Sequence, residues 1–459
     1  MIKLYNSLTK QNEELKPINE GLVKMYTCGL TVYSNPHIGN MRAYIFMDTL
    51  RRVIKYNGLE IDGVMNITDV GHLTSDSDSG DDKMESAAKK QNKSPYEIAE
   101  YYTNLFFDDM KKLNIDTPEH ITKATEYIPQ MIEFIKKLEA NGYTYIIDDG
   151  VYFDVKKFKD YGQLSNKNMD EVGVARVEEN TQKHHPYDFA LWKFVPDSHI
   201  MKWDSPWGVG CPGWHIECST MSADILGDHF DIHTGGIDHL TIHHENEIAQ
   251  NYGAFGRKVV EMWIHNEFVL VKGGKMGKSL NNFYTLDQLK EMGYEPLAFK
   301  FFCLNTNYSK KINFTFDALR ASQTALNNLK KQLHEHKDGE NVVDDEKLDK
   351  YREEFLNAIN DNLNTPLAIG LLFNMIKNEP KSKDIYNLAL EFDSVFGLSL
   401  GVLEKTQEDD IPEDILELGR LRWEAKKNKN FADADKYRDE IIAKGYKILD
   451  SKDGYDIKR

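Results

Sequence analysis

Apolar and polar positions alternate between strand-like and helix-like patterns near the N-terminus. Residues 22–30 (LVKMYTCGL) form a short apolar run that is typical of a buried strand, and a polar turn follows. From about residue 37 to 56, apolar residues recur at helical spacing, and Asn57-Gly58 supplies residue types that commonly end a helix. A further apolar run at residues 63–68 predicts a second strand. This order predicts a βαβ unit, which begins a parallel sheet with helices on its faces.

The pattern changes in the middle of the chain. Residues 118–141 predict a helix, and residues 143–155 predict a hairpin around Asp148-Asp149-Gly150. Residues 156–205 are polar and irregular, so we expect an inserted module there rather than part of the sheet core.

The alternation of helices and strands resumes after Pro206. Helices are predicted at residues 215–226 and 239–255, a short strand at 230–233, and a strand or hairpin at 259–271. After about residue 316 we expect helices to the end of the chain. Polar breaks near residues 336–345 and 404–413 interrupt them, and the second break predicts a linker to a small last module.

The composition is that of a globular protein with ample core. A chain of 459 residues predicts two to four domains, and no apolar run approaches the 18 residues of a membrane span. The N-terminus lacks a signal-peptide pattern, so we expect a cytoplasmic protein that does not enter a membrane. Cysteine is too scarce for a disulfide scaffold, which favours free thiols or metal ligands. The four cysteines are Cys28, Cys211, Cys218 and Cys303.

The net charge of −17 at first argues against a nucleic-acid partner, because phosphate contacts need Lys and Arg. The charge is uneven, however. Residues 420–459 contain 12 Lys and Arg against 8 Asp and Glu, a local charge of +4, which leaves −21 for the other 419 residues. A basic C-terminal segment can therefore bind RNA locally, while the acidic remainder limits non-specific binding.

One candidate ligand site lies at residues 36–40 (PHIGN), where the first predicted strand leads into its helix. Ligands of open α/β sheets bind at such a point, and a helix N-terminus offers N–H groups that suit phosphate. Gly39 would allow close approach to the backbone, and His37 adds a donor. An ordinary helix start would also explain these residues.

A second candidate is the basic, glycine-rich segment 272–280 (KGGKMGKSL), which follows an apolar run. A loop of this kind can place ammonium groups against charge that develops on an anionic ligand. The Gly-x-x-x-x-Gly-Lys spacing of a P-loop is absent. A solvated basic turn is an equally good explanation of the segment by itself.

A third candidate is a metal site. On a helix, His243 and Glu247 are four residues apart and share a face, while Cys218 lies upstream and Cys28 ends the first predicted strand. Two thiolates, one imidazole and one carboxylate suit tetrahedral Zn²⁺. Buried thiols acting as small apolar groups would be the alternative. Five polar residues in a row at 243–247 (HHENE) cannot all face solvent if their helix packs on a core.

Together these motifs resemble a known family. Residues 37–40 (HIGN) and 275–279 (KMGKS) are similar to the two signatures of class I aminoacyl-tRNA synthetases, with Asn40 and Gly277 where His and Ser are usual. Four further segments resemble cysteinyl-tRNA synthetases of the bacterial type, along the whole chain. These segments are residues 26–29 (YTCG), 66–69 (NITD), 212–218 (PGWHIEC) and 243–250 (HHENEIAQ).

The resemblance implies an α/β Rossmann-like, parallel-sheet catalytic domain at residues 1–314, with a connective insertion at about 116–205. The basic segment 272–280, called the lysine loop below, would belong to a segment at about 262–314 that contacts the tRNA acceptor stem. An all-α helical bundle at 315–403 and a small C-terminal anticodon-binding module at 404–459 would follow.

The resemblance also implies the activity, which is ATP-dependent ligation of L-cysteine to cysteine tRNA through a cysteinyl-adenylate. One Zn²⁺ per subunit would recognise the substrate thiolate, and ATP would bind with Mg²⁺; we expect a monomer. The implied metal ligands are Cys28, Cys218, His243 and Glu247, without Cys211. The implied catalytic and ATP-binding residues are His37, Gly39, Asn40, Asp238, Lys275 and Lys278. The candidates for the cysteine pocket are Thr68, Trp214 and His233.

Two other functions fit parts of this pattern. A ligase that joins cysteine to an amino sugar in thiol biosynthesis would keep the same catalytic core but would need no anticodon module. A non-catalytic tRNA-binding paralogue would need neither the metal ligands nor the signature lysines. The helical segment after residue 316 and the basic tail favour a tRNA enzyme over the amino-sugar ligase. The presence of His37, Lys275, Lys278 and the four metal ligands argues against the non-catalytic paralogue.

Overall fold

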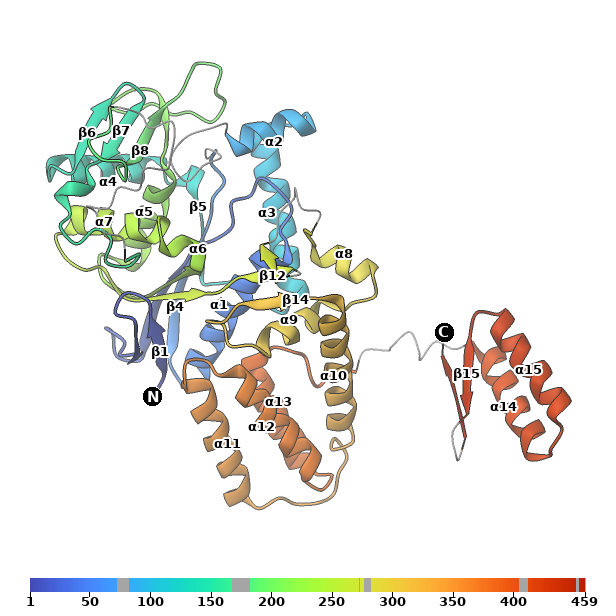
Figure 1. Cartoon of the computed structure of the whole chain (residues 1–459). Helices are drawn as coiled ribbons and strands as arrows, with labels where there is room; N and C mark the ends of the chain where they lie inside the picture. Colours follow the sequence, from blue (N-terminus) through green and yellow to red (C-terminus); the bar gives the residue numbers. More distant parts are fainter. Residues whose placement is uncertain are drawn as a thin grey trace. The chain divides into compact units, whose positions relative to one another are not determined.

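The computed structural model describes residues 1–71, 82–166, 182–271, 273–275, 282–403, 412–450 and 454–458 (Figure 1). These residues form two compact units, Met1–Leu400 and Gly401–Arg459. No helix in the described ranges is long and apolar enough to cross a membrane.

The centre of the first unit is a five-stranded sheet in which all neighbours are parallel. Its strands, in spatial order, are β11 (Val260–Asn266), β10 (Phe230–Gly236), β3 (Leu22–Thr27), β4 (Glu60–Ile67) and β5 (His120–Lys123). The predicted strands at residues 22–30, 63–68 and 230–233 are thereby confirmed.

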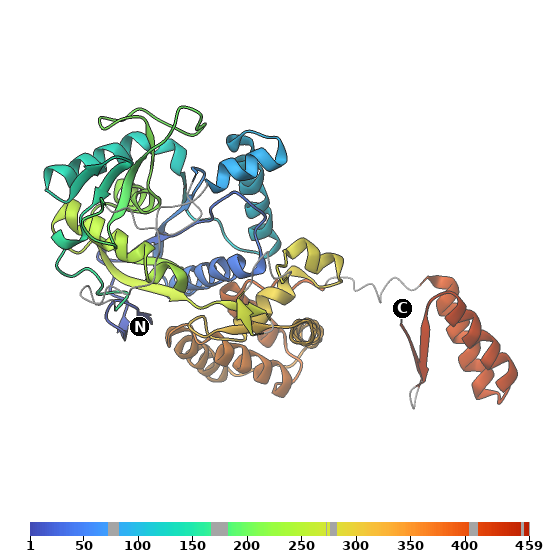
Figure 2. The same ribbon diagram turned by 45° about the horizontal axis from the view of Figure 1, so that its top comes forward.

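Both faces of this sheet are covered, as parallel sheets require. Alternate residues of β3 point to opposite faces, so Met25 belongs to one apolar core and Tyr26 to the other. Helix α1 (Ile38–Tyr56), which connects β3 to β4 and ends at Asn57 as predicted, packs in the first core. Helices α4 (Ile128–Ala140), α5 (Trp214–Leu226) and α7 (His243–Phe255) contribute to the second. Figure 2 shows α1 beside the sheet from another direction. The predicted α/β Rossmann-like class is confirmed.

The prediction of one helix over residues 118–141 is wrong in its first third. Strand β5 occupies residues 120–123, and a short 3₁₀ turn, η1 (Ala124–Glu126), separates it from α4. The register of β5 with β4 pairs His120 with Val64 and Lys123 with Ile67. Tertiary pairing at the edge of the sheet thus overrides a local pattern that cannot distinguish a short strand from a first helical turn. Helices α2 (Lys83–Gln91) and α3 (Pro95–Lys112) precede it.

The insertion is a four-stranded antiparallel sheet in the order β6-β7-β8-β9. Strands β6 (Thr144–Ile147) and β7 (Gly150–Phe153) form the predicted hairpin, and η2 (Val155–Lys157) follows. The expectation that residues 156–205 are irregular is wrong for β8 (Phe189–Phe194), which is central to this sheet and pairs with β9 (Gly210–Pro212). Residues 189–192 are buried, so their apolar run lacks the alternation that marks a half-exposed strand.

The predicted strand or hairpin at residues 259–271 is divided between two sheets. It contains β11 of the parallel sheet and β12 (Val269–Val271), which pairs with β13 (Gly274–Lys275) and, in parallel, with β14 (Ile312–Phe314). Helices α8 (Leu286–Glu291) and α9 (Pro296–Leu304) lie between them in sequence. At the N-terminus, β1 (Lys3–Asn6) and β2 (Gln11–Glu14) form a separate antiparallel pair.

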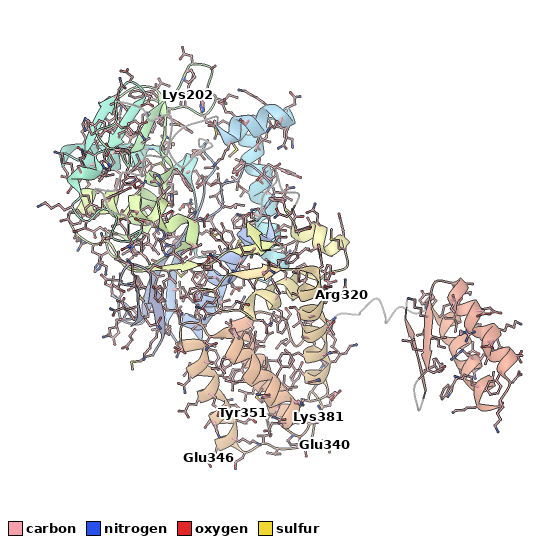
Figure 3. All side chains as sticks on the ribbon, viewed as in Figure 1. Lys202, Arg320, Glu340, Glu346, Tyr351 and Lys381 are labelled. Atoms are coloured by element: carbon pink, nitrogen blue, oxygen red, sulfur yellow. The ribbon has the colours of Figure 1, made fainter. Side chains whose placement is uncertain are left out.

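The helices expected after residue 316 are present in the rest of the first unit. They are α10 (Phe316–His334), α11 (Asp345–Asn360), α12 (Thr365–Asn378) and α13 (Lys383–Phe396). Ion pairs join their ends, such as Lys347 with Glu379 and Lys381 with Glu335, both at 2.7 Å; Lys381 is labelled in Figure 3.

The second unit has its own small core of Ile415, Ile441, Tyr446 and Ile457. Helices α14 (Glu413–Lys427) and α15 (Phe431–Ala443) agree with the expected helical end, but the last residues do not. They form a hairpin of β15 (Lys447–Asp450) and β16 (Tyr455–Lys458). Most of the predicted linker, residues 404–411, lies outside the described residues. The finer domain boundaries stay predictions.

Candidate active site and metal centre

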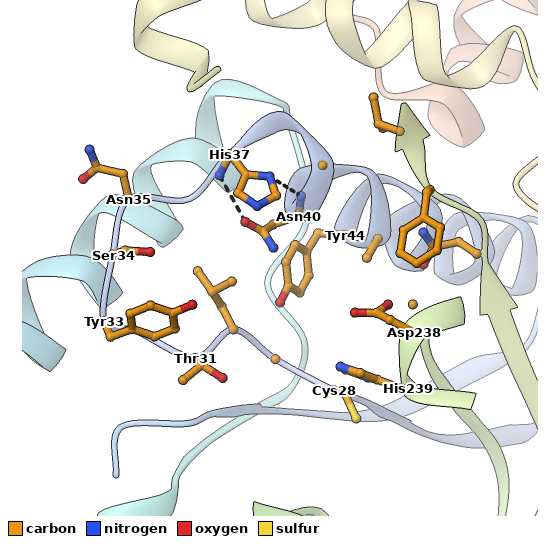
Figure 4. Close-up of a pocket in the computed structure, with 18 of the residues that line it drawn as sticks. Cys28, Thr31, Tyr33, Ser34, Asn35, His37, Asn40, Tyr44, Asp238 and His239 are labelled. Atoms are coloured by element: carbon orange, nitrogen blue, oxygen red, sulfur yellow. Dashed lines mark hydrogen bonds between the residues drawn. The ribbon is translucent and has the colours of Figure 1, made fainter. Parts of the chain in front are cut away.

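A cleft of about 560 Å³ opens at the carboxyl ends of the parallel strands (Figure 4). This is where ligands of open α/β sheets bind. Cys28, directly after β3, lies at one end with His239, and His37 and Asn40 lie at the other, as Figure 4 shows. Asp238 is on the cleft wall between them. One cavity therefore extends from Cys28, one of the predicted metal ligands, to the predicted phosphate site.

His37 and Asn40 form a reciprocal cap at the start of α1. The backbone N–H of Asn40 donates to His37 Nδ1, and the backbone N–H of His37 donates to Asn40 Oδ1, both at 3.2 Å. Because Nδ1 accepts, the ring proton of neutral His37 is assigned to Nε2. The ring also meets the edge of Phe283 at 4.8 Å. The first helical turn is thus fixed with its N–H groups beside the cleft, an arrangement suited to phosphate.

The remaining predicted nucleotide-binding residues are only partly within the described chain. Gly39 lines the cleft in the first turn of α1, and Asp238 lies in the one-turn helix α6 (Ile237–Leu240) after β10. A Cβ on Gly236 would lie 2.3 Å from Asp238 Oδ1, so a larger residue there would displace the Asp238 carboxylate. Lys275 ends β13, and Lys278 lies outside the described residues, so its role stays a prediction.

The four predicted metal ligands converge on one point. Cys28 Sγ lies 3.8 Å from Cys218 Sγ and 4.0 Å from Glu247 Oε1. His243 Nε2 lies 3.4 Å from Cys218 Sγ and 3.1 Å from Glu247 Oε1. Zinc bonds of about 2.0–2.3 Å imply separations of roughly 3.3–3.8 Å between tetrahedral ligands. All four side chains are buried, so this donor set has the chemistry and spacing that Zn²⁺ requires.

A second set of donors overlaps the first. His233 and His244, with Cys28 and Glu247, also have donor atoms within 4.8 Å of one another. His233 Nε2 is 2.8 Å from Glu247 Oε2, and His244 Nε2 is 3.3 Å from Cys28 Sγ. Hydrogen bonds of this kind, from residues that do not bind the metal themselves, commonly orient metal ligands. The first set offers two sulfur donors and the second only one, and sulfur donors favour zinc.

Two of the four donors, Cys218 and Glu247, already favour the anionic forms that bind metal, whereas burial raises the pKa of the Cys28 thiol. Burial alone would raise the pKa of Cys218, but the hydrogen bond with Cys28 and the charge of His243 lower it to about 7. Burial would also raise the pKa of Glu247, yet His233 and His243 lower it to about 2. Burial opposes protonation of His243, but Cys218 and Glu247 raise its pKa to about 10. A divalent cation can take the place of the His243 proton, because metal ligands must be deprotonated.

Cys211 lies outside both donor sets. Burial raises the pKa of its thiol to about 12, so the neutral form dominates near neutral pH. This agrees with its omission from the predicted ligands.

The three predicted pocket residues take different positions. Trp214 lines the cleft, and its ring centre is 4.4 Å from that of His243. Thr68 is buried and donates to Glu217 Oε2 at 2.9 Å. His233 is buried between Glu247 and the ring of Trp263, on which it stacks at 4.5 Å. Trp214 is therefore a wall of the cleft, while Thr68 and His233 lie behind it.

The sequence predictions did not single out three residues of this region. His239 and Lys83 line the cleft, and His244 bonds Cys28. Burial lowers the pKa of His239 to about 4, which makes it neutral at physiological pH. The doubled histidine at positions 243–244 was a usable signal for His244, whereas Lys83 follows residues 72–81, which carry no comparable pattern.

Comparisons with known proteins identify related sequences and folds. Residues 14–324 match the family model described as tRNA synthetases class I (C) catalytic domain. Curated proteins named cysteine–tRNA ligase are similar over nearly the full chain. The one from Treponema denticola is 40% identical over 98% of this chain and 98% of its own. Those from Chlorobaculum tepidum and Novosphingobium aromaticivorans are 40% and 41% identical, over 99% and 98% of this chain and 98% and 95% of their own.

Solved structures share the fold at low identity. Methionyl-tRNA synthetase of Mycobacterium tuberculosis, bound by methionyl-adenylate, has a TM-score of 0.60 at 14% identity, over 83% of this chain and 92% of that one. LeuRS of Agrobacterium radiobacter K84, in a complex with tRNA and LeuAMS, has a TM-score of 0.59 at 12% identity. The similarity covers 86% of this chain and 87% of that one.

Proposed function

The chain belongs to the class I tRNA synthetases, in the cysteine–tRNA ligase family, and we propose that cysteinyl-adenylate forms in the cleft between Cys28 and His37. The enzyme is an ATP-dependent ligase that joins L-cysteine to tRNA. The observation that carries the proposal is the continuity of this cleft. A buried thiolate, imidazole and carboxylate cluster at one end and a capped helix N-terminus at the other can hold the two reactants of a single step.

At the cysteine end, Cys28, Cys218, His243 and Glu247 would hold one Zn²⁺ per subunit. When bound, the metal supplies a site for the thiolate of cysteine that the hydroxyl of serine fills poorly, since zinc favours sulfur. Trp214 closes the cleft wall beside these ligands, and the neutral ring of His239 adds no positive charge there. His233 and His244 hold the Glu247 and Cys28 donor atoms in place from behind.

At the nucleotide end, ATP would bind with Mg²⁺. The α1 N-terminus with His37, Gly39 and Asn40 would hold the phosphates, and Asp238 would face the ribose. The cysteine carboxylate then attacks the α-phosphorus, which forms a P–O bond and releases pyrophosphate. Lys275 and Lys278 would stabilise the charge on this leaving group.

In the second step, the 2′-hydroxyl of the terminal tRNA adenosine attacks the carbonyl carbon of the adenylate, and AMP leaves. The partner would be cysteine tRNA, with the basic residues of the Gly401–Arg459 unit on its anticodon side. Lys427, for example, lies 5.5 Å from the ring centre of Trp423, a pairing of cation and aromatic face that suits a nucleic acid. We further propose that the enzyme works as a cytoplasmic monomer.

The decisive experiment is ATP–pyrophosphate exchange dependent on cysteine, with serine as the control, followed by charging of cysteine tRNA. We expect exchange with cysteine, an exchange rate with serine lower by roughly 10⁴-fold, and charged tRNA. Exchange without charging would favour the amino-sugar ligase. Absence of both exchange and charging would favour the non-catalytic paralogue. The near full-length similarity to cysteine–tRNA ligases favours neither alternative.

A further inference from the structure

Arg42 is a buried arginine in the second turn of α1 whose guanidinium group bonds only to backbone among its described contacts. Its two Nη atoms donate to the carbonyl oxygens of Phe268, at 2.5 Å, Tyr308, at 3.4 Å, and Lys310. The side chain lies two residues beyond Asn40 on the same helix. The helix that carries the predicted phosphate site is therefore bonded directly to two distant segments of chain.

Both segments lead into the three-stranded sheet β13-β12-β14, which contains Lys275. Phe268 immediately precedes β12, and Lys310 precedes β14, its parallel neighbour. Strand β12 pairs in turn with β13, which ends at Lys275. Residues 267–269 also line the catalytic cleft. Arg42 thus connects α1 to the cleft wall at residues 267–269 and to the sheet that contains Lys275.

The chain on the far side of the lysine loop is also bound to the start of α1. The backbone N–H of Ile38 donates to the carbonyl of Tyr284 at 3.0 Å, and the ring of Phe283 meets that of His37. The described chain on both sides of residues 276–281 is therefore fastened to the first two turns of one helix. Arg42 forms the hydrogen bond between α1 and the chain that precedes β12.

We propose that Arg42 is a positioning residue for adenylate formation, which holds the β12–β14 sheet in register with the phosphate site on α1. The role rests on the proposed function, because strand β13 of this sheet contains Lys275, which with Lys278 is predicted to act on a phosphate held by His37 and Asn40. Arginine suits this role because its rigid, planar group has five donors, while lysine has a single donor centre. A misplacement of about 1 Å in such a constellation can cost about 10²-fold in rate.

The bonds of Arg42 are not needed to satisfy every carbonyl it contacts. The Phe268 oxygen also accepts from the Ile312 N–H, at 3.0 Å, and the Tyr308 oxygen from the Glu267 N–H, at 2.9 Å. Replacement of Arg42 therefore leaves these two groups with a partner, and the fold should survive. What the replacement removes is the fixed distance between the helix and the sheet.

The test compares Arg42→Met with Arg51→Met. Arg51 is buried on the same helix but forms its two bonds with Glu119, at 2.7 and 2.9 Å, beside Gly63 of β4 and outside the residues that line the cleft. The two substitutions thus remove the same group from the same helix. The measurements are zinc content, melting temperature, and kcat and KM of cysteine-dependent ATP–pyrophosphate exchange. Exchange by the unchanged enzyme is measured first, so that failure of the proposed function is seen separately.

We expect Arg42→Met to lower kcat of exchange about 10²-fold while zinc content and KM for cysteine stay within about threefold. Arg42→Lys should recover about tenfold of the loss, and Arg51→Met should keep kcat within about threefold despite a lower melting temperature. The proposal is overturned if Arg42→Met keeps its kcat, or if the two methionine variants lose kcat in parallel with stability. If Arg42→Met does not fold, Arg42→Lys at full zinc content decides in the same way.

Discussion

The two ends of the cleft are built differently. At the cysteine end, Cys218, His243 and Glu247 are buried on helices α5 and α7, and the pKa values of Cys218 and Glu247 are already lowered toward the anionic forms that bind metal. At the nucleotide end, His37 and Asn40 form the cap of α1 and are only partly buried. We assign discrimination between substrates to the cysteine end. Stabilisation of developing charge is assigned to groups that the chain brings together from separate segments.

This difference separates two kinds of measurement. Changes at the cysteine end should alter metal content and cysteine binding together, because the ligands and the pocket are one cluster. Changes at the nucleotide end should alter the rate of adenylate formation while metal content and cysteine binding stay constant.

The largest effect is expected from Cys218→Ala. The variant loses one of two sulfur donors, so its zinc content should fall. The rate of cysteine-dependent exchange should fall with it, by roughly 10⁴-fold. Metal analysis and exchange assays on the same sample check both. Cys211→Ala is the matched control, since Cys211 is also buried but lies outside the donor sets. A Cys218→Ala enzyme with full exchange activity and no zinc would end the metal hypothesis.

The next largest effect belongs to the nucleotide end. Lys278→Ala should lower kcat of exchange by about 10²–10³-fold with little change in KM for cysteine or in zinc content, because the ammonium group acts on charge in the transition state. Lys290→Ala removes the same charge from an exposed position on α8 and should change little. Equal losses in kcat and in cysteine binding would count against the separation of the two ends.

The sequence predicted the cysteine end better than its surroundings, for physical reasons. His243 and Glu247 are placed by helical spacing alone, so their common face could be predicted from a local pattern. The partners of Thr68 and His233 come from α5 and α7, and only the folded sheet decides that these two side chains lie behind the cleft. Arg42 bonds to backbone carbonyls more than 200 residues away, for which the sequence carries no pattern.

The fold shows the same limit. The βαβ start, α5 and the hairpin at residues 143–155 follow from local periodicity and turn residues. Strands β5 and β8 were missed because each depends on pairing with a distant strand, β5 with β4 and β8 with β7. Their sequences are too short or too uniformly apolar to separate a strand from other structures by periodicity.

A smaller effect is expected when the cap of α1 is altered. Asn40→Ala removes the acceptor for the His37 N–H and should cost about 1 kcal/mol of stability. Asn40→Asp keeps an acceptor there but adds a negative charge to the cleft. We expect Asn40→Asp to be the more stable variant with the higher KM for ATP, as measured by thermal unfolding and exchange kinetics. If Asn40→Ala has the higher KM for ATP, the side chain acts mainly as a phosphate donor.

The smallest effect concerns the attachment of α2, which brings Lys83 to the nucleotide end. His199 Nε2 lies 3.1 Å from Asp82 Oδ2, and its Nδ1 lies 3.5 Å from Glu85 Oε1. The hydrogen bond with Asp82 raises the pKa of His199. Burial alone would raise the pKa of Asp82, but the hydrogen bonds from His199 and from the Glu85 backbone lower it.

The pair should therefore stabilise the fold only between two pH limits. The raised pKa of His199 contributes stability that is fully present below about pH 6.5 and is lost as the pH rises through the pKa of the folded state. The lowered pKa of Asp82 contributes stability above about pH 4, which is lost as the pH falls through the pKa of the folded state. His199→Gln should lower the melting temperature by less than about 2 °C near pH 5.5 and by less still near pH 8.5. His120→Gln removes an imidazole that pairs with Asp62 at 2.9 Å but is 46% exposed, and it should lower the melting temperature less than His199→Gln does near pH 5.5. Equal shifts for His199→Gln at both pH values would mean that packing, not charge, attaches α2.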